Sequence, residues 1–401
     1  IYTWDHTLSL HDALPIFDKD KKQVVIANKY DFIDLSQFYI DFQIIEDGYE
    51  IYKGTTKLPA LKPNTIAKIK LPYNVELNQE KESFINLQLR LKEANHWAEK
   101  DYAMAHWQFA INEIENRLQE VKESKEAFLV QEDKTQLTLE NKGFKISFDK
   151  QNGEILYWKY DGFEVISDRK GSPHYNNNRW IENDKHGDSI SGDIASSCEI
   201  NLNKEHTKAE VKITTKGEKC PYTIEYIVYS NNIVDMKVTM NPIVEGLRRL
   251  GLGMIFSKDF EEIDYYAKGP WENYNDRQEA SFVGRYSTTV SDMLTPYAHP
   301  QSCGNRQEMR EIFLYKKGST KGLKIEANQP IAFSMLHFDD KDFNKEKLHP
   351  WELNLREEVY VHFDFVQRGL GNGSCGPQTI EKYQVPSSGT YSFTLRFSPL
   401  R

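Results

Sequence analysis

Cysteine is scarce in this chain of 401 residues, which contains only Cys198, Cys220, Cys303 and Cys375. The four residues form no C-x-x-C pair and have no histidine at ligand spacing, so the sequence predicts no zinc site. Four cysteines in so long a chain also do not amount to a disulfide-stapled scaffold, and the redox compartment stays open.

An excess of positive charge is absent as well. The 51 lysines and arginines are outnumbered by 60 acidic residues, which gives a net charge of −9. Nucleic-acid-binding proteins carry a basic surface patch, so we exclude nucleic acid as a partner. No apolar run approaches the length of a membrane-spanning helix, so we also expect no membrane partner.

Aromatic residues, in contrast, are abundant, with 21 Phe, 22 Tyr and 7 Trp, and this composition can bury a core. Residues 38–44 and 85–91 alternate between apolar and polar side chains, which is the period of a half-buried strand. Asp47 followed by Gly48 predicts a hairpin turn. Four or more short strands within about 100 residues indicate that residues 18–112 form an immunoglobulin-like β-sandwich.

The same alternation returns further along the chain, at residues 209–215, 222–229 and 233–240. Helical and strand patterns do not alternate, which argues against a parallel sheet. We therefore expect an all-β chain in which residues 135–401 form a large antiparallel β-sandwich. The highly charged residues 113–134 between the two regions are expected to form a linker.

The chain begins with the segment IYTWDHTLSLHDALPIF, residues 1–17. We do not expect this segment to be a signal peptide, because it has no initiating Met and no basic n-region, and His11 and Asp12 interrupt its apolar residues. Its codons can instead be written as those of a common short-read sequencing adapter that carries a sample index. We therefore interpret residues 1–17 as an adapter-derived, non-native segment and leave them out of the fold.

Three loop-like stretches rich in polar and aromatic residues are candidates for a functional site: residues 172–184, 267–286 with 291–306, and 362–377. In the second stretch, Trp271 with Tyr274 and Arg277 could form a platform for a sugar or a packed cluster at a strand end. Asp276 and Glu279 could pair as the acid and base of a glycosidase, but structural salt bridges are the favoured interpretation.

The third stretch contains GLGNGSCG, residues 369–376, which could pass for a phosphate-binding loop. It lacks the Lys-Ser/Thr pair and a following helix, so a glycine-rich turn is favoured. Cys375 in this loop could act as a nucleophile. No histidine is placed to activate it, and an ordinary thiol is the favoured interpretation.

Taken together, these stretches resemble a known family. Residues 269–277 (GPWENYNDR) resemble the G-P-x-E-N-Y-x-D-R motif of the large bacterial β-galactosidases of glycoside hydrolase family 2. Asn183 and Asp184 lie where that family shows R-A-P-x-D-N-D, as a partial match, and residues 370–376 match its late loop, often G-G-D-D-S-W. Further segments follow at the spacing of the family: residues 291–293, 295–297 and 304–306.

The resemblance implies a domain order. In such enzymes a (β/α)₈ barrel carries the two catalytic glutamates and is followed by an immunoglobulin-like domain and a very large β-sandwich of the galactose-mutarotase-like type. Residues 18–112 and 135–401 match the last two domains, so we expect no catalytic residue in this chain and no activity from it alone. The magnesium and sodium sites of the family are built mainly on other domains, so we expect no metal and no cofactor here.

The resemblance also implies a role for the late loop, which in the family reaches the mouth of the barrel and supplies a Trp that stacks on the sugar. Cys375 stands at that position here, and a thiol cannot provide an aromatic platform. Our hypothesis is that Asn372, Ser374 and Cys375, with Asn183 and Asp184, still rim the active site of the full enzyme.

The expected function is therefore that of the C-terminal part of a retaining β-galactosidase, which acts on terminal β-D-galactose residues and forms a homo-oligomer as the full-length enzyme. Two alternatives remain open. The chain could be a freestanding carbohydrate-binding or structural β-sandwich protein, or a separately encoded small subunit. The sequence leaves the compartment undecided between cytoplasm and periplasm.

Overall fold

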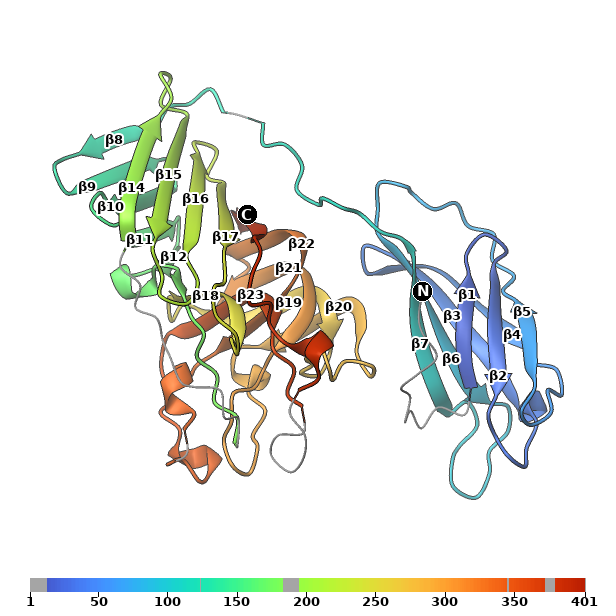
Figure 1. Ribbon diagram of the computed structural model, residues 1–401. Helices are drawn as coiled ribbons and strands as arrows, with labels where there is room; N and C mark the ends of the chain where they lie inside the picture. The colour runs from blue at the N-terminus through green and yellow to red at the C-terminus, as the bar shows by residue number, and fades with distance from the viewer. Residues whose placement is uncertain (1–12, 123, 183–194, 345, 372–378, 401) are drawn as a thin grey trace. The chain divides into compact units, whose positions relative to one another are not determined.

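The computed structural model describes residues 13–122, 124–182, 195–344, 346–371 and 379–400 (Figure 1). The chain divides into two compact units, Ile1–Ile114 and Glu115–Arg401. All strand pairs in the described residues are antiparallel, which confirms the all-β prediction. The helices of this part of the chain are single 3₁₀ turns: η1 (Leu35–Gln37), η2 (Arg169–Gly171), η3 (Ser291–Met293), η4 (Asp340–Asp342), η5 (Pro350–Glu352) and η6 (Glu381–Tyr383).

In the described residues of the first unit the strands form two sheets, and their bounds are β1 (Ala13–Asp18), β2 (Gln23–Asn28), β3 (Phe38–Glu46), β4 (Tyr49–Lys57), β5 (Ile66–Lys70), β6 (Ser83–Leu91) and β7 (Ala103–Asn112). One sheet has the order β1-β2-β5 and the other β4-β3-β6-β7. The two sheets enclose one hydrophobic core, as the alternation in the sequence predicts.

The hairpin between β3 and β4 shows how local sequence sets this sandwich. Asp47 and Gly48 have φ angles of 46° and 81°, the left-handed region that a two-residue hairpin turn needs. Strand β3 pairs with β6 so that Ile40 faces Leu89 and Phe42 faces Leu87. This register places the apolar residues of both strands on the buried face, and the predicted hairpin is confirmed.

Residues 13–17, which the sequence analysis left out of the fold, form most of strand β1. The strand pairs with β2, with Phe17 opposite Val24 and Pro15 opposite Ile26. Pairing at a sheet edge uses main-chain donors and acceptors, so it depends little on sequence, and proline is tolerated on an edge strand. A segment of foreign origin can therefore still occupy this edge.

Residues 113–134, expected as a linker, differ from that expectation in their second half. Leu129–Glu132 is strand β8, and Phe128 before it is buried and donates its N–H to the carbonyl of His206 at 2.8 Å. Earlier in the segment, the N–H of Arg117 donates to the carbonyl of Asn328 at 3.1 Å. From Glu115 onward the segment belongs to the second unit, with which it makes these backbone hydrogen bonds.

The smaller sheet of the second unit, in its described part, has five strands in the order β12-β11-β10-β9-β8. Besides β8, its strands are β9 (Gln136–Asn141), β10 (Phe144–Asp149), β11 (Ile155–Tyr160) and β12 (Phe163–Ile166). The sheet is a meander, since each strand pairs with its sequence neighbour, and Gly143 and Gly153 provide turns with φ of 80° and 73°.

The larger sheet of the second unit has twelve strands in the described residues: β13 (His174–Tyr175), β14 (Ala195–Leu202), β15 (Lys208–Thr215), β16 (Tyr222–Tyr229), β17 (Val234–Met240), β18 (Arg249–Phe256), β19 (Phe260–Gly269), β20 (Phe282–Thr289), β21 (Arg306–Lys316), β22 (Gly322–Leu336), β23 (Val359–Gln367) and β24 (Tyr391–Leu400). Its main path runs β13-β18-β23-β22-β24-β17-β16-β15-β14, and β21, β19 and β20 branch from β22.

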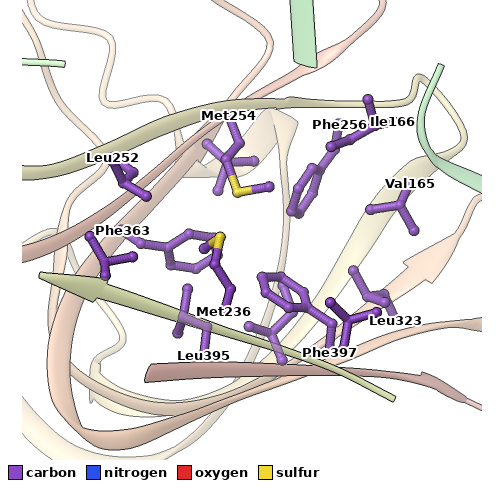
Figure 2. Packing of buried hydrophobic residues seen from close by; sticks show 14 of the residues in the cluster. Val165, Ile166, Met236, Leu252, Met254, Phe256, Leu323, Phe363, Leu395 and Phe397 are labelled. Atoms are coloured by element: carbon purple, nitrogen blue, oxygen red, sulfur yellow. The ribbon is translucent and has the colours of Figure 1, made fainter. Parts of the chain in front are cut away.

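A single hydrophobic core fills the space between these two sheets. Figure 2 shows Val165 and Ile166 of the smaller sheet beside Phe256, Leu323 and Phe397 of the larger one, and all five are buried. Burial of such side chains stabilises the fold by roughly 1.5–3 kcal/mol each, relative to an exposed position. Among the described residues, no helix has the length and apolar character that a membrane span requires.

Candidate functional site

The three polar stretches singled out in the sequence meet at one place in the second unit. There, buried polar side chains from all three are joined by hydrogen bonds. We call this set the polar junction, and it comprises Asn177, Arg179, Asn273, Asn305, Asp364 and Gln367, each at most 2% exposed. Buried polar groups are costly unless they are hydrogen-bonded, so an extensive buried set of this kind specifies one arrangement of the loops that supply it.

Gln367, the last residue of β23, is the centre of the polar junction. Its Nε2 donates to Oδ1 of Asn305 at 3.1 Å and to Oδ2 of Asp364 at 3.0 Å. Its backbone carbonyl accepts from Nδ2 of Asn275 at 2.8 Å, and its Oε1 accepts from Arg179 at 3.4 Å. Gln367, through its side chain and its backbone carbonyl, thus connects the end of β23 with the loops that follow β13, follow β19 and precede β21.

Asn273, in the GPWENYNDR segment, ties two of these loops together. Its Nδ2 donates to the carbonyls of Lys268 and Trp271, and its Oδ1 accepts from the N–H of Gln307 at 2.8 Å. Its backbone N–H donates to the carbonyl of Asn305 at 2.9 Å, and its own carbonyl accepts from Nδ2 of that residue at 2.7 Å. The motif asparagine is therefore structural, and it fixes the backbone on both sides of Glu272.

Asp276 of the same motif holds the start of the late loop. Its Oδ1 accepts from the N–H of Leu370 at 3.0 Å, and its Oδ2 accepts from the N–H of Gly371 at 2.8 Å. A Cβ on Gly369 would lie 2.6 Å from the Asp276 carboxyl group, so this position needs glycine for the close approach. We call this arrangement the Asp276 clamp, and it fixes the backbone directly before Asn372.

The Asp276 clamp corrects the sequence interpretation of Asp276 and Glu279. We expected Asp276 in a salt bridge rather than in an acid–base pair, and the structure shows instead a carboxylate that accepts backbone N–H groups through both oxygens. Glu279 is exposed. Main-chain N–H groups stabilise a carboxylate much as a cation does, but sequence spacing cannot reveal a partner 95 residues away.

Arg179 anchors the first stretch to the same loop. Its side chain is 1% exposed, and Nη2 donates to the carbonyl of Gly369 at 3.3 Å while Nη1 donates to the carbonyl of Arg368. Asn177 beside it accepts the backbone N–H groups of Arg248 and Arg249 at 2.7 and 3.1 Å. The residues just before Asn183 and the residues just before Asn372 are therefore held by one network.

Glu272 organises the exposed side of the motif. Its Oε2 accepts from Oγ1 of Thr295 and from the N–H of Gly304, both at 2.9 Å, and its Oε1 accepts from Arg277 and from the hydroxyl of Tyr297. Burial, followed by the hydrogen bond to the Glu272 carboxylate, raises the pKa of Tyr297 to about 12. The phenol therefore stays protonated and acts as a hydrogen-bond donor at neutral pH.

The three residues considered as a sugar platform lie in different environments. Tyr274 is 2% exposed and lies under the guanidinium of Arg277, at 5.2 Å from ring centroid to Cζ, so these two form a packed cluster. Trp271, in contrast, is 73% exposed. The packed-cluster interpretation thus holds for Tyr274 and Arg277 but not for Trp271.

The residues that we expected to rim an active site, Asn183, Asp184, Asn372, Ser374 and Cys375, lie outside the described residues. The described neighbours on either side are held in place. The N–H of Glu182 donates to Oε1 of Gln301 at 2.9 Å, and on the far side of the late loop Oγ1 of Thr379 donates to the carbonyl of Gly369 at 3.0 Å.

A second buried polar group, not predicted from the sequence, lies beside the polar junction. Arg249 pairs with Asp364 at 3.2 Å and with Asp340 at 3.8 Å, and Nε2 of His362 lies 2.8 Å from Oδ2 of Asp340. Burial by itself would raise the pKa of Asp340, but the charge and hydrogen bond of His362, with Arg249 and Asn176, lower it to about 2. The sequence feature that could have indicated this group is the presence of a His and an Asp within the otherwise apolar strand VYVHFDFVQ.

Metal and thiol chemistry find no support in the described part of the chain. No group of three or more His, Cys, Asp or Glu there is arranged to hold a metal ion. Cys198 and Cys303 are free cysteines, and burial raises the pKa of the Cys303 thiol to about 12. A thiol with so high a pKa is a poor nucleophile.

A groove of about 1050 Å³ lies elsewhere in the second unit and shares no lining residue with the polar junction. It runs between the β11–β12 hairpin, residues 255–259 and residues 356–360. Charges of both signs line it, including Lys258 and Glu357, which pair with each other at 2.8 Å. This mixture of already paired charges does not point to one class of ligand.

Two models of known protein families match this chain, one for each of its two units. The family model described as β-galactosidase small chain matches residues 140–397, and that described as β-galactosidase domain 4 matches residues 24–112. The order of the two matches is that of the two units.

Similar curated proteins are named β-galactosidase. The chain is 21% identical to the protein of Priestia megaterium (96% of this chain, 38% of that protein) and 24% identical to that of Actinobacillus pleuropneumoniae (94% and 37%). It is 28% identical to that of Lactococcus lactis (78% and 33%). The chain thus spans less than two-fifths of the length of these relatives.

Among solved structures, an aldose epimerase homologue from C. elegans aligns with a TM-score of 0.37 and 9% identity, over 65% of this chain and 96% of that one. The family assignment depends on the sequence matches, and above all on the model that covers residues 140–397. By that match, this chain belongs to the β-galactosidase small-chain family.

Proposed function

We propose that this chain is the C-terminal part of a β-galactosidase that hydrolyses terminal, non-reducing β-D-galactose residues with retention of configuration. The observation that carries the proposal is the match of both units, in order, to two β-galactosidase domains. The relatives, which are all named β-galactosidase, extend well beyond the length of this chain. A polypeptide of that length would hold a catalytic domain in addition to the two units.

In this proposal the catalytic carboxyl pair lies outside the described residues. Retaining glycosidases use two carboxyl groups about 5–5.5 Å apart, one as nucleophile and one as acid and base. In the relatives' family such a pair is expected on a barrel, and the helices described here are single 3₁₀ turns that cannot build one. The metal ions of such an enzyme would likewise be held by its other domains.

The task of this chain in the enzyme is then to position loops at the substrate. The Asp276 clamp fixes residues 370 and 371, and Arg179 fixes the backbone that leads to Asn183. We propose that Asn372, Ser374 and Cys375, with Asn183 and Asp184, rim the galactoside site from these two anchored positions. The full-length enzyme is proposed to be a homo-oligomer.

The experiment compares the chain with the longer polypeptide of its gene. The DNA upstream of the codon for Phe17 is recovered, the complete reading frame is expressed, and hydrolysis of a nitrophenyl β-D-galactoside is measured for it and for residues 18–401. We expect turnover by the complete polypeptide and none by residues 18–401. Turnover by residues 18–401 would contradict the assignment of catalysis to another domain, and an inactive complete polypeptide would overturn the proposed function.

A further inference from the structure

Trp271 presents its indole ring to solvent in a way that the other exposed tryptophans do not. Trp97 and Trp351 each lie against another ring of the chain, with centroid distances of 6.0 Å to Tyr102 and 4.4 Å to His349. Trp271 is 73% exposed, and the described residues offer no ring stacked on it. The indole ring of Trp271 is therefore largely accessible to a ligand.

The backbone beneath this exposed ring is held by buried hydrogen bonds. The hydroxyl of Tyr265, a 1% exposed residue, donates to the carbonyl of Pro270 at 3.1 Å, and Nδ2 of the fully buried Asn273 donates to the carbonyl of Trp271 at 2.9 Å. A largely exposed side chain thus stands on a fixed support. Such a support reduces the entropy lost when a ligand binds, which is a property of preorganised sites.

Hydrogen-bond donors are linked to Trp271 through the next residue in the chain, Glu272. Glu272 binds Arg277 and Tyr297, and the Arg277 guanidinium reaches both Glu272 and Tyr297 through Nη2. Its side chain is 49% exposed, and no acceptor among the described residues engages Nε or Nη1. These N–H groups can therefore donate hydrogen bonds to a ligand.

The charge of this surface selects the kind of ligand. The positive charge of Arg277 is matched by the carboxylate of Glu272, so the surface attracts no anion as an unpaired arginine would. It offers the aromatic ring of Trp271 together with two hydrogen-bond donors, the neutral hydroxyl of Tyr297 and the guanidinium of Arg277, whose charge Glu272 neutralises. A neutral molecule with one face of C–H groups and a rim of hydroxyls, which is a sugar ring, matches both parts.

We propose that Trp271 is a stacking platform for a β-galactoside, with Arg277 donating hydrogen bonds to the sugar oxygens. The choice of galactose rests on the proposed function, and the axial 4-hydroxyl of galactose leaves an apolar face of C–H groups that suits an indole ring. This platform is built from described residues alone and belongs to the chain itself, so it can be tested without a catalytic domain.

The test is binding of lactose and methyl β-D-galactopyranoside to the whole chain, observed by saturation-transfer NMR and by tryptophan fluorescence. We expect a weak site, with a Kd of about 1–10 mM, and a loss of affinity of about tenfold or more in Trp271→Ala. Trp271→Phe should retain most of the affinity, because it keeps an aromatic face. Trp351→Ala is the matched control, since that residue is equally exposed at 78%.

The results of these binding experiments test the Trp271 platform independently of the proposed galactosidase function. Absence of binding, unchanged binding in Trp271→Ala, or an equal loss in Trp351→Ala would overturn the platform, including the case in which a protein partner covers Trp271 instead. Preference for maltose over lactose would overturn its assignment to galactosides. Hydrolysis by the complete polypeptide is measured separately, and it can succeed or fail whatever the result of these binding experiments.

Discussion

The two units bury polar groups in very different amounts. In the first unit the buried polar and charged residues are few, and Asp41 pairs with Arg90 near the surface at 3.1 Å. In the second unit arginines, aspartates and amides are buried together at one place, where they join three loops. A sandwich can be built by apolar alternation alone, so the buried polar set of the second unit has a different purpose, which is to fix loops.

The largest expected effect comes from breaking the buried pair of the second unit. Asp364→Ala leaves Arg249 buried without its nearest carboxylate, and we expect the second unit to lose about 3–5 kcal/mol of unfolding free energy. The matched change in the first unit, Asp41→Ala, should remove only about 1 kcal/mol, because Arg90 can turn to solvent. Hydrogen–deuterium exchange of peptides from each unit during urea unfolding measures both values, and equal losses would contradict the comparison.

Acid should weaken the second unit through Asp340. The pKa of this carboxyl group is about 2 in the folded chain, below its ordinary value of 3.8. The charged form therefore stabilises the fold above pH 3.8, and the contribution, about 2 kcal/mol, is lost as the pH falls towards 2. Asp340→Asn should flatten the acid limb of the stability curve of the second unit, measured by urea unfolding between pH 5 and 2, whereas an unchanged limb would refute this account.

The Asp276 clamp should have a smaller effect on stability and a local effect on the late loop. Asp276→Ala removes two acceptors for backbone N–H groups, so we expect a loss of about 1–2 kcal/mol and faster amide exchange at Leu370 and Gly371. The exposed neighbour Glu279 provides the control, and Glu279→Ala should change neither quantity. Unchanged exchange at residues 370 and 371 in Asp276→Ala would show that other contacts hold the loop.

The smallest effect is expected from removal of the N-terminal segment. Deletion of residues 1–16 removes most of β1 but keeps Phe17, whose ring lies 5.9 Å from that of Phe109. Since β1 is an edge strand, the first unit should keep its fold and lose no more than about 1 kcal/mol. Loss of cooperative unfolding in the first unit would instead mean that the segment is an integral part of the sandwich.

Much of the fold could be predicted from the sequence, because strand formation depends on local patterns. The alternation at residues 38–44 and 85–91 placed the core faces of β3 and β6, and Asp47 with Gly48 placed the turn between β3 and β4. The GPWENYNDR motif also identified the family that the sequence matches then confirmed. The pairing of the edge strand β1 with β2 was not predicted, because it is made by main-chain hydrogen bonds that depend little on sequence.

The strands, their buried faces and the family follow from the sequence alone, since those properties depend on side chains a few positions apart. The roles of the polar residues, in contrast, depend on the folded arrangement of distant segments. Asp276 meets the backbone of Gly371 across 95 residues, and Arg179 meets Gly369 across 190. No local pattern encodes such partners, so an aspartate that could have been a catalytic acid proved to be a clamp, and a tryptophan that could have been core proved to be exposed.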